Sequence, residues 1–355
     1  MAVESAKTTP LHLPALDGLR GFAALVVLVS HCANAGFLPA ALGGGLGKMG
    51  VTLFFGLSGF LMAYLYCREE FTPRAVWSYM VNRLARVLPL YYAVVIVTVI
   101  SFYAFGIVLL DAGNVQAMVF NAGLIRGSSV LWTIPVEVHF YIVFMLLWMA
   151  FQSVRFVPAV LCLAGAQIAL VAVMFSLGFE IGLLLAGWLH IFIFGAVLGA
   201  NYQLLKGYSS RPAAQRFLTG LAWASLALLI IAPPEVRQGL GLPTLPPFID
   251  PLSVGIPLLM LIFTVFLIGP FSFFKTGLLR WYGKISYSLY LLHIIVLDCV
   301  EYYVAGDATL SYAGFPATLL LATIVAWLSF TYLERPAHQL LRRSLVFPAG
   351  KRQKV

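Results

Sequence analysis

Residues 16–32 read LDGLRGFAALVVLVSHC, an apolar run with Arg20 near its start and His31 near its end. Eleven helical steps of about 100° return to nearly the same face, so the two side chains share one side of a helix, about 16 Å apart along its axis. An ionisable group that deep in a bilayer is costly and commonly marks a pathway or a reaction site. The alternative is that Arg20 anchors the helix at the membrane surface and His31 packs as a polar core residue.

The whole chain has the composition of a membrane protein. Hydrophobic residues make up 61% of its 355 residues and charged residues 10%, against about 45–50% and about 25% in soluble domains. We predict an all-α, polytopic transmembrane helix bundle that forms one integral-membrane domain over residues 1–355, with short cytoplasmic tails at about 1–15 and 335–355. About ten spans are expected, with the fourth short for a bilayer, at about 16–36, 50–67, 88–110, 136–151, 157–177, 183–205, 216–232, 252–270, 285–304 and 314–333.

The basic residues predict the orientation of the bundle. With the N-terminus inside and ten alternating spans, 19 of the 22 Lys and Arg residues fall on the cytoplasmic side, and only Lys48, Arg126 and Arg237 fall outside. This is the positive-inside pattern, and it predicts that both termini are cytoplasmic. Because topology explains the net charge of +9, we expect no nucleic-acid partner.

The segment after the second span carries a pair of arginines. Arg83 and Arg86 are three residues apart in NRLARVLPLYY (82–92), so on a helix they point the same way. Two guanidiniums aimed together suit a phosphorylated ligand, because each can bind phosphate oxygens in a bidentate manner. The alternative is that they anchor the helix to lipid headgroups.

An acidic residue opens the fourth span. Glu137 lies in LWTIPVEVHFY (131–141), two residues after Pro135, which suits a first helical turn. Carboxylates in or beside spans are commonly functional, although one at the boundary can simply be hydrated. We expect Glu137 to belong to the site.

Polar residues also follow one face of the ninth span. Ser286, Tyr290 and His293 have helical spacing in KISYSLYLLH (284–293) and form a stripe on an otherwise apolar helix. Such a stripe either joins helices together or lines a site.

The sixth span carries a histidine and two glycines. His190 lies in mid-helix, and Gly195 and Gly199 follow with the spacing of close helix packing. His190 is a further candidate for lining a cavity. The four cysteines are scattered without a CxxC or CxxH pair, so neither a disulfide framework nor a metal site is expected.

Six blocks in order give the chain a strong resemblance to the integral-membrane acyltransferase family 3. They are LDGLRGFAALVVLVSH (16–31), VTLFFGLSGFLMA (51–63), NRLARVLPLYY (82–92), LWTIPVEVHFY (131–141), YGKISYSLYLLH (282–293) and YLERPA (332–337). The resemblance covers nearly the whole chain. It implies an enzyme of a bacterial inner membrane that moves an acyl group, usually acetyl, from cytoplasmic acyl-CoA to a hydroxyl on an extracytoplasmic acceptor. Acceptors in the family include cell-surface glycans, lipid-linked saccharides and small secreted molecules.

The resemblance also assigns residues. Arg20 and His31 match the Arg-x10-His pair of the family, Arg83 and Arg86 match its donor-site Arg-x-x-Arg motif, and Glu137 matches the glutamate of its W-T-x-x-x-E block. His293 matches the histidine that closes the S-Y-S-L-Y block. This chain departs from the family at Val138, where many members carry a second acidic residue, and at His190, where many carry an arginine. Both departures bear on the acceptor more than on the chemistry.

These expectations combine into a mechanism. Arg83 and Arg86 would hold the donor phosphates, and Arg20 would position the donor at the entry. His31 would act as a general base, while Glu137 would either orient His31 or bind the acceptor. Direct transfer and a covalent acyl-histidine remain alternatives, and no metal is required. The alternative functions are acylation of a small secreted metabolite and a non-enzymatic transporter or flippase for a glycan or lipid.

Overall fold

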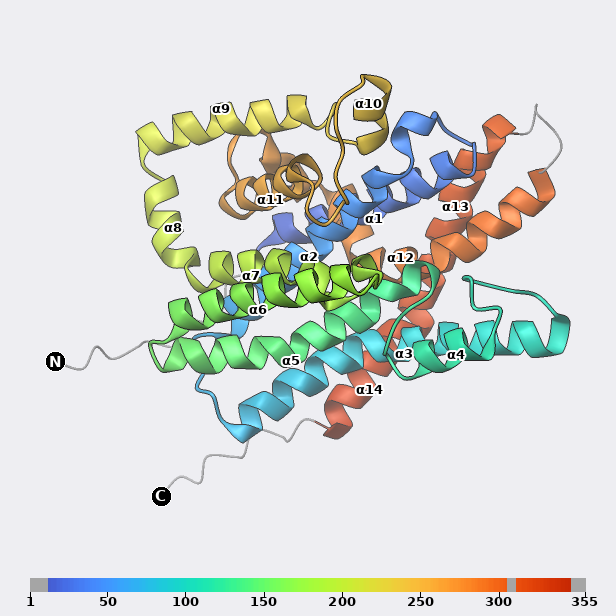
Figure 1. Cartoon of the computed structure of the whole chain (residues 1–355), viewed down its shortest axis with the longest axis horizontal. Coiled ribbons are helices and arrows are strands. Elements are labelled where there is room, and N and C mark those ends of the chain that lie inside the picture. Colours follow the sequence, from blue (N-terminus) through green and yellow to red (C-terminus); the bar gives the residue numbers. More distant parts are fainter. Residues whose placement is uncertain (1–11, 305–310, 346–355) are drawn as a thin grey trace.

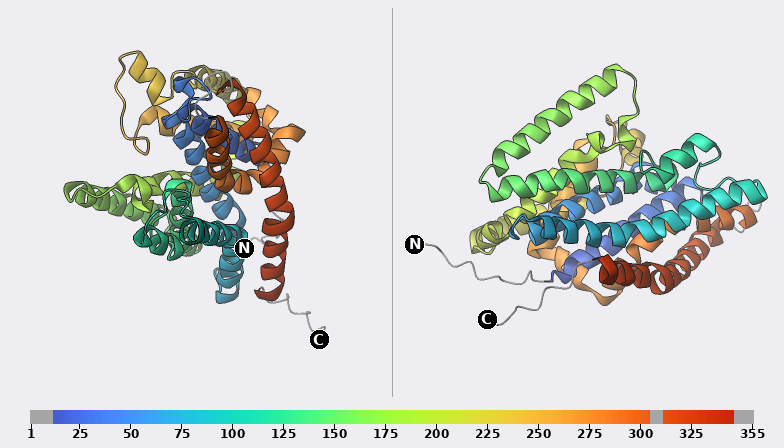
Figure 2. Two further views of the ribbon diagram at one scale, coloured as in Figure 1. Left: turned by 90° about the vertical axis from the view of Figure 1, so that its right-hand side faces the viewer. Right: turned by 90° about the horizontal axis from the view of Figure 1, so that it is seen from below.

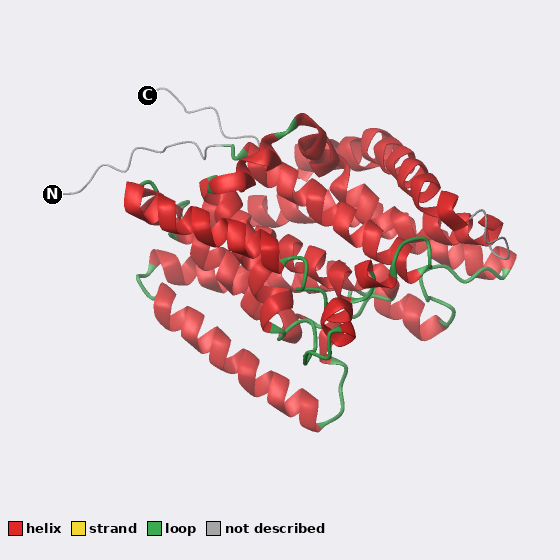
Figure 3. Cartoon of the chain, turned by 90° about the horizontal axis from the view of Figure 1, so that it is seen from above, coloured by secondary structure: helices red, strands yellow, loops and turns green. Residues whose placement is uncertain are grey.

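The computed structural model describes residues 12–304 and 311–345, and within these ranges every regular element is a helix (Figures 1 and 3). The long helices are α1 (Pro14–Asn34), α2 (Gly45–Tyr66), α3 (Pro73–Phe105), α5 (Thr133–Gln152), α6 (Phe156–Ser176), α7 (Leu185–Ala200), α9 (Pro212–Leu228), α11 (Pro251–Phe266), α12 (Gly277–Val304) and α13 (Ser311–Ser329). The shorter α-helices are α4 (Val115–Ala122), α8 (Tyr202–Ser209), α10 (Pro234–Gly239) and α14 (Arg335–Leu345). Four 3₁₀ segments, η1 (Ala40–Leu42), η2 (Ser129–Trp132), η3 (Ile181–Leu183) and η4 (Gly269–Lys275), and a π-helical turn, η5 (Phe330–Glu334), complete the described part.

The structure supports the predicted count of about ten spans only in part. Each of the ten expected stretches contains a helix, but seven described helices are long and apolar enough to cross a bilayer, or nine if two bent pairs each count as one span. The pairs α7–α8 and α11–η4 bend by 72° and 74° at their breaks, and α9 has only 17 residues. Apolar composition predicts a straight span in each of these stretches, because composition does not reveal where a helix breaks. The short fourth stretch is lengthened at its start by η2, which makes a span of 24 residues.

Glycines let the central helices approach closely. In the centre of the bundle, α1 packs on α12 and α2 packs on α7. A Cβ built on Gly283 of α12 would lie 1.9 Å from the Asp17 carbonyl oxygen of α1, and one on Gly195 of α7 would lie 2.1 Å from the Gly56 carbonyl oxygen of α2. The predicted close packing at Gly195 and Gly199 is therefore confirmed, since a Cβ on Gly199 would likewise meet the α2 backbone.

The outer helices present apolar side chains to the surroundings. In α6 only Gln167 is buried, and Figure 2 shows this helix at the edge of the bundle in both views. Its exposed side chains include Leu161, Ile168 and Phe175. An apolar helix that is not covered by protein suits the hydrocarbon core of a membrane.

A buried ion pair fastens the segment before α11. Arg237 Nη2 lies 2.6 Å from Asp250 Oδ2, and Asp250 also caps α11 by accepting from the Ser253 amide at 2.8 Å. Burial alone would raise the pKa of Asp250, but hydrogen bonds from Arg237 and Ser253 hold it down at about 2. A carboxyl with a lowered pKa stabilises the fold above about pH 4 and loses that contribution as the pH falls through its folded pKa.

Candidate active site

Two cavities adjoin inside the bundle. The larger, of about 620 Å³, is lined by His31 and is called here the histidine cavity. The smaller, of about 70 Å³, is called the arginine cavity, and its charged lining residues are Arg20, Arg83, Arg86 and Glu137. Val51 of α2 and Tyr290 of α12 line both cavities. Guanidiniums therefore lie on one side of these two shared side chains and an imidazole on the other.

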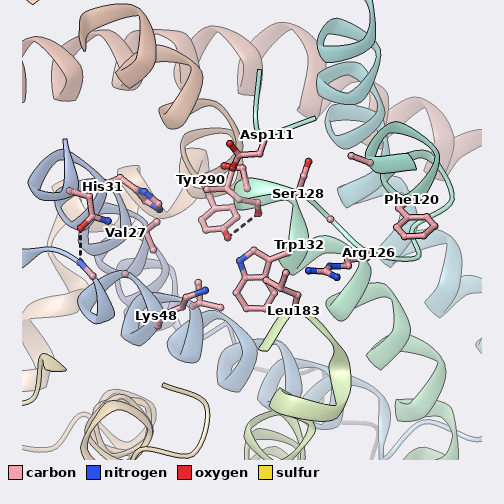
Figure 4. A pocket seen from close by; sticks show the side chains of 18 of the residues that line it. Val27, His31, Lys48, Asp111, Phe120, Arg126, Ser128, Trp132, Leu183 and Tyr290 are labelled. Atoms are coloured by element: carbon pink, nitrogen blue, oxygen red, sulfur yellow. Dashed lines mark hydrogen bonds between the residues drawn. The ribbon is translucent and has the colours of Figure 1, made fainter. Parts of the chain in front are cut away.

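The histidine cavity combines an aromatic wall with polar groups. Figure 4 shows His31, Lys48 and Tyr290 facing the same space, with Trp132 forming part of its wall. The Lys48 ammonium lies 4.6 Å from the centre of the Trp132 ring, a cation–π distance. Arg126 lies across the cavity in the same view and also forms an ion pair with Glu180. Further polar lining residues are Asn34, Asp111, Asn114, Gln116 and Ser128.

His31 has a second histidine beside it. The ring centres of His31 and His293 are 5.1 Å apart, and His293 is 1% exposed. The Nδ1 atom of His293 lies 2.7 Å from the Tyr290 carbonyl oxygen and 3.1 Å from that of Leu289. Because carbonyl oxygens only accept hydrogen bonds, Nδ1 must carry the proton. The Nε2 atom is buried and has no hydrogen-bond partner among the described residues, so in the neutral ring its lone pair is free.

The arginine cavity contains one carboxylate among three guanidiniums. Glu137 Oε1 accepts a hydrogen bond from Ser58 Oγ at 2.5 Å, and the Tyr141 hydroxyl also bonds Glu137. Among the charges that act on Arg20 are those of Arg86 and Glu137. The net positive charge of this lining suits an anionic ligand such as a phosphate.

A residue that the sequence analysis did not single out lies beside this cavity. Glu334 ends the π-helical turn η5, is 6% exposed and accepts a hydrogen bond from Ser288 Oγ at 2.8 Å. The positive charges of Arg86 and Arg20 attract the Glu334 carboxylate. The available signal was an acidic residue in the YLERPA block, at the end of an apolar stretch. Turns of π-helix are frequent at functional sites.

The structure brings most of the predicted residues together. Arg20, Arg83, Arg86, Glu137 and Ser286 line the arginine cavity, His31 lines the histidine cavity, Tyr290 lines both, and His293 packs beside His31. Ser286 Oγ donates to the Gly283 carbonyl oxygen at 2.9 Å, so its hydroxyl also serves its own helix.

His190 is the exception. It lines neither cavity, and its Nδ1 lies 2.9 Å from Gln167 Nε2 of α6. This contact links α7 to the peripheral α6. Helical position alone could not have shown this, because it does not reveal which neighbouring helix a side chain meets. Within the described residues, no three His, Cys, Asp or Glu side chains come together as a group that could hold a metal ion.

Comparison with known proteins identifies a class of reaction, the transfer of an acyl group. The sequence profile of a family described as an acyltransferase domain matches residues 13–331. The chain is also 27% identical over 380 residues to the acyltransferase MdmB of Streptomyces mycarofaciens, an alignment that covers 94% of this chain and 93% of MdmB.

Two further relatives have more specific names. The chain is 25% identical over 378 residues to the O-acetyltransferase OatA of Staphylococcus aureus (strain NCTC 8325 / PS 47), covering 92% of this chain and 57% of OatA. It is 29% identical over 322 residues to the exopolysaccharide production protein ExoZ of Rhizobium meliloti (strain 1021), covering 84% of this chain and 90% of ExoZ. No solved structure matches the chain.

Proposed function

The chain belongs to acyltransferase family 3, and we propose that it transfers an acetyl group from cytoplasmic acetyl-CoA to a hydroxyl of an extracytoplasmic or lipid-linked saccharide. That it is a membrane enzyme transferring acyl groups follows from the family and its relatives. The finer proposal depends on one observation: the arginine cavity and the histidine cavity share Val51 and Tyr290 as lining residues. We propose that they act as one path.

The arginine cavity supports the donor assignment. Arg83 and Arg86 would bind the phosphates of CoA, with Arg20 beside them, because guanidiniums match phosphate oxygens in charge and geometry. The arginine cavity has a volume of only about 70 Å³. A cavity of this size suits the thin pantetheine arm of CoA better than its nucleotide. We assign the arginine cavity to the cytoplasmic side of a bacterial inner membrane, since with ten alternating spans 19 of the 22 basic residues would lie on that side, as the positive-inside rule predicts.

The histidine cavity supports the acceptor assignment. Its larger volume, the Trp132 wall and the surrounding amide and hydroxyl side chains are the combination that binds a polyhydroxylated molecule. The relative named for exopolysaccharide production favours a saccharide. Two of the three basic residues assigned to the outer side, Lys48 and Arg126, line this cavity.

Transfer would take place where the cavities meet. His31 would accept the proton of the acceptor hydroxyl as its oxygen attacks the thioester carbonyl. The new C–O bond forms, the C–S bond breaks, and His31 returns the proton to the departing CoA thiolate. Trapping of an acylated His31 in the absence of acceptor would instead indicate a covalent intermediate.

Glu137 lies in the arginine cavity with Ser58, and its charge acts on Arg20. The sequence predicts that Glu137 orients His31 or binds the acceptor, and its position among the arginines favours a third role. We therefore propose that Glu137 holds Arg20 in position for the donor, and that His293 is the neighbour that positions His31.

The test uses membranes that contain equal amounts of wild type, His31→Gln or His190→Gln, supplied with acetyl-labelled acetyl-CoA. His190 is a matched control because it is a half-buried histidine of a span that lies outside both cavities. We expect wild type and His190→Gln to release CoA and to label a saccharide fraction, and His31→Gln to be slower by about 10²–10⁴-fold.

Each result bears on a separate part of the proposal. Equal transfer by His31→Gln and wild type would remove His31 from the mechanism. Label that enters only small secreted metabolites would contradict the saccharide acceptor but keep the chemistry. Release of CoA only with longer acyl donors would contradict acetyl-CoA as the donor.

A further inference from the structure

A third cavity lies away from the path, where the two broken helix pairs meet. It has a volume of about 550 Å³ and is called here the basic hollow. It is lined by Tyr202 and Lys206 of α8, by Phe266 and Leu267 at the α11–η4 break, and by Lys275 at the end of η4. It shares no lining residue with the arginine cavity or the histidine cavity.

The backbone at the hollow is shaped by these breaks. Leu267 ends α11 with φ of +55°, in the left-handed region that non-glycine residues seldom adopt. The Tyr202 and Phe266 rings stack with centres 5.8 Å apart and an interplanar angle of 6°, which joins one break to the other. The hollow is therefore a built feature between two helix pairs rather than a gap between independent side chains.

The lining carries positive charge without a counterion. Lys206, Lys275 and Arg280 line the hollow, no Asp or Glu lines it, and none of the three forms an ion pair within the described residues. Arg280 Nε is buried and has no hydrogen-bond partner there. The histidine of the lining, His12, already bonds Asp17 at 3.0 Å.

The Lys206 ammonium lies 5.8 Å from the centre of the Tyr202 ring, but it has no anionic partner among the described residues. Cations without a counterion, together with one buried guanidinium N–H, favour an anionic ligand with several oxygens. A phosphate group fits, because Arg binds it through a directed N–H fork and Lys as a point charge. The floor of the hollow is apolar, with Val265, Phe266, Leu267 and Ile268 among its lining residues. Leu204 and Leu278, each two residues from a basic lining residue in the sequence, are 59% and 68% exposed and offer apolar surface suited to acyl chains.

We propose that the basic hollow binds the phosphate headgroup of an anionic membrane phospholipid, whose acyl chains lie along the apolar surface beside it. The site is separate from the donor site, because Arg280 and the donor residue Arg20 belong to different cavities. A bound lipid would tie the two broken pairs together and so stabilise the folded bundle by mass action.

The experiment measures lipid binding by the purified full-length protein in detergent. Phosphatidylglycerol is titrated against phosphatidylcholine with the same acyl chains, and binding is followed by the rise in the thermal unfolding midpoint. Each basic residue near an anionic headgroup strengthens binding about fivefold. The triple variant Lys206→Gln, Lys275→Gln, Arg280→Gln should therefore bind phosphatidylglycerol roughly a hundredfold more weakly than wild type.

Two further variants separate loss of the site from loss of the fold. Lys284→Gln removes an exposed charge one turn beyond Arg280 without touching the hollow, and it should bind as wild type does. The charge-preserving variant Lys206→Arg, Lys275→Arg, Arg280→Lys should retain preference for phosphatidylglycerol.

Three outcomes would overturn the proposal. Equal stabilisation by the two lipids would show that the headgroup is not recognised. Wild-type affinity in the triple variant would place the lipid elsewhere. Equal protection by inorganic pyrophosphate or CoA without lipid, lost in the triple variant, would identify a site for a soluble phosphate and contradict the lipid assignment.

Discussion

The position of one proton on His293 decides how the two histidines can cooperate. Two backbone carbonyls fix that proton on Nδ1, which leaves Nε2 as a bare acceptor inside the protein. A buried acceptor without a partner is unfavourable by about 1–3 kcal/mol. The centre of the His31 ring lies 5.1 Å from that of His293. We infer that Nε2 accepts a hydrogen bond during the reaction, from His31 or from a substrate hydroxyl, and that this bond offsets the cost.

We predict that His293→Asn keeps the fold and slows transfer. The Asn amide can donate to the same carbonyls as Nδ1 does, but it has no group in the place of Nε2. Loss of that acceptor should lower kcat about tenfold, the effect of one hydrogen bond in a buried site. Steady-state kinetics with a thermal unfolding control measures this, and a kcat within twofold of wild type would mean that His293 only packs.

At the scale of the elements, the π-helical turn η5 matters most. It lies between α13 and α14, and the extra residue in such a turn shifts the register of the helix that follows. Glu334, at the end of the turn, is thereby buried next to Ser288 and acts on the donor arginines. We infer that its charge keeps Arg20 and Arg86, which repel each other, in one arrangement.

We predict that Glu334→Gln raises the KM for acetyl-CoA about tenfold while kcat changes less. Gln can still accept the Ser288 hydrogen bond, so only the negative charge is removed. The donor site then loses a preorganised arrangement of its guanidiniums. Glu301→Gln, an exposed carboxylate change on α12, is the control. A lower KM would show instead that Glu334 competes with the CoA phosphates.

The contact between α1 and α12 depends on the absence of a side chain at Gly283. A Cβ there would overlap the Asp17 carbonyl oxygen, and overpacking commonly destabilises by about 1–3 kcal/mol. We predict that Gly283→Ala lowers the thermal unfolding midpoint in detergent. Gly165→Ala on the outer α6 meets nothing within 4 Å, so it should leave the midpoint unchanged or raise it. Equal midpoints for the two variants would contradict the tight packing.

At the scale of the whole molecule, helical periodicity explains what the sequence could reveal. Spacing placed Arg20 and His31 on one face and Arg83 with Arg86 on another, and in the structure these residues line adjoining cavities. Periodicity fails where the helix is irregular, and the π-turn therefore concealed Glu334. Helical periodicity likewise does not reveal the bends after α7 and after α11, where two apolar stretches break into two helices each.

Contacts between helices were harder to predict than the faces of single helices. His190 had the position of a lining residue, but its partner is Gln167 of a peripheral helix. The sequence indicates only that Lys48 is an outer charge, whereas in the structure it packs on Trp132 inside the histidine cavity. Both outcomes depend on which helices become neighbours, and this follows from tertiary packing rather than local sequence.

The central claim is that the two cavities act as one path, and the junction residue Val51 tests it most directly. The measurement is acetyl transfer by Val51→Trp alongside CoA binding, with Val97→Trp on the exposed face of α3 as the control. The bulky side chain should block the junction, so that CoA still binds at the arginines while transfer falls about a hundredfold or more. Wild-type transfer by Val51→Trp, with CoA binding intact, would contradict the account.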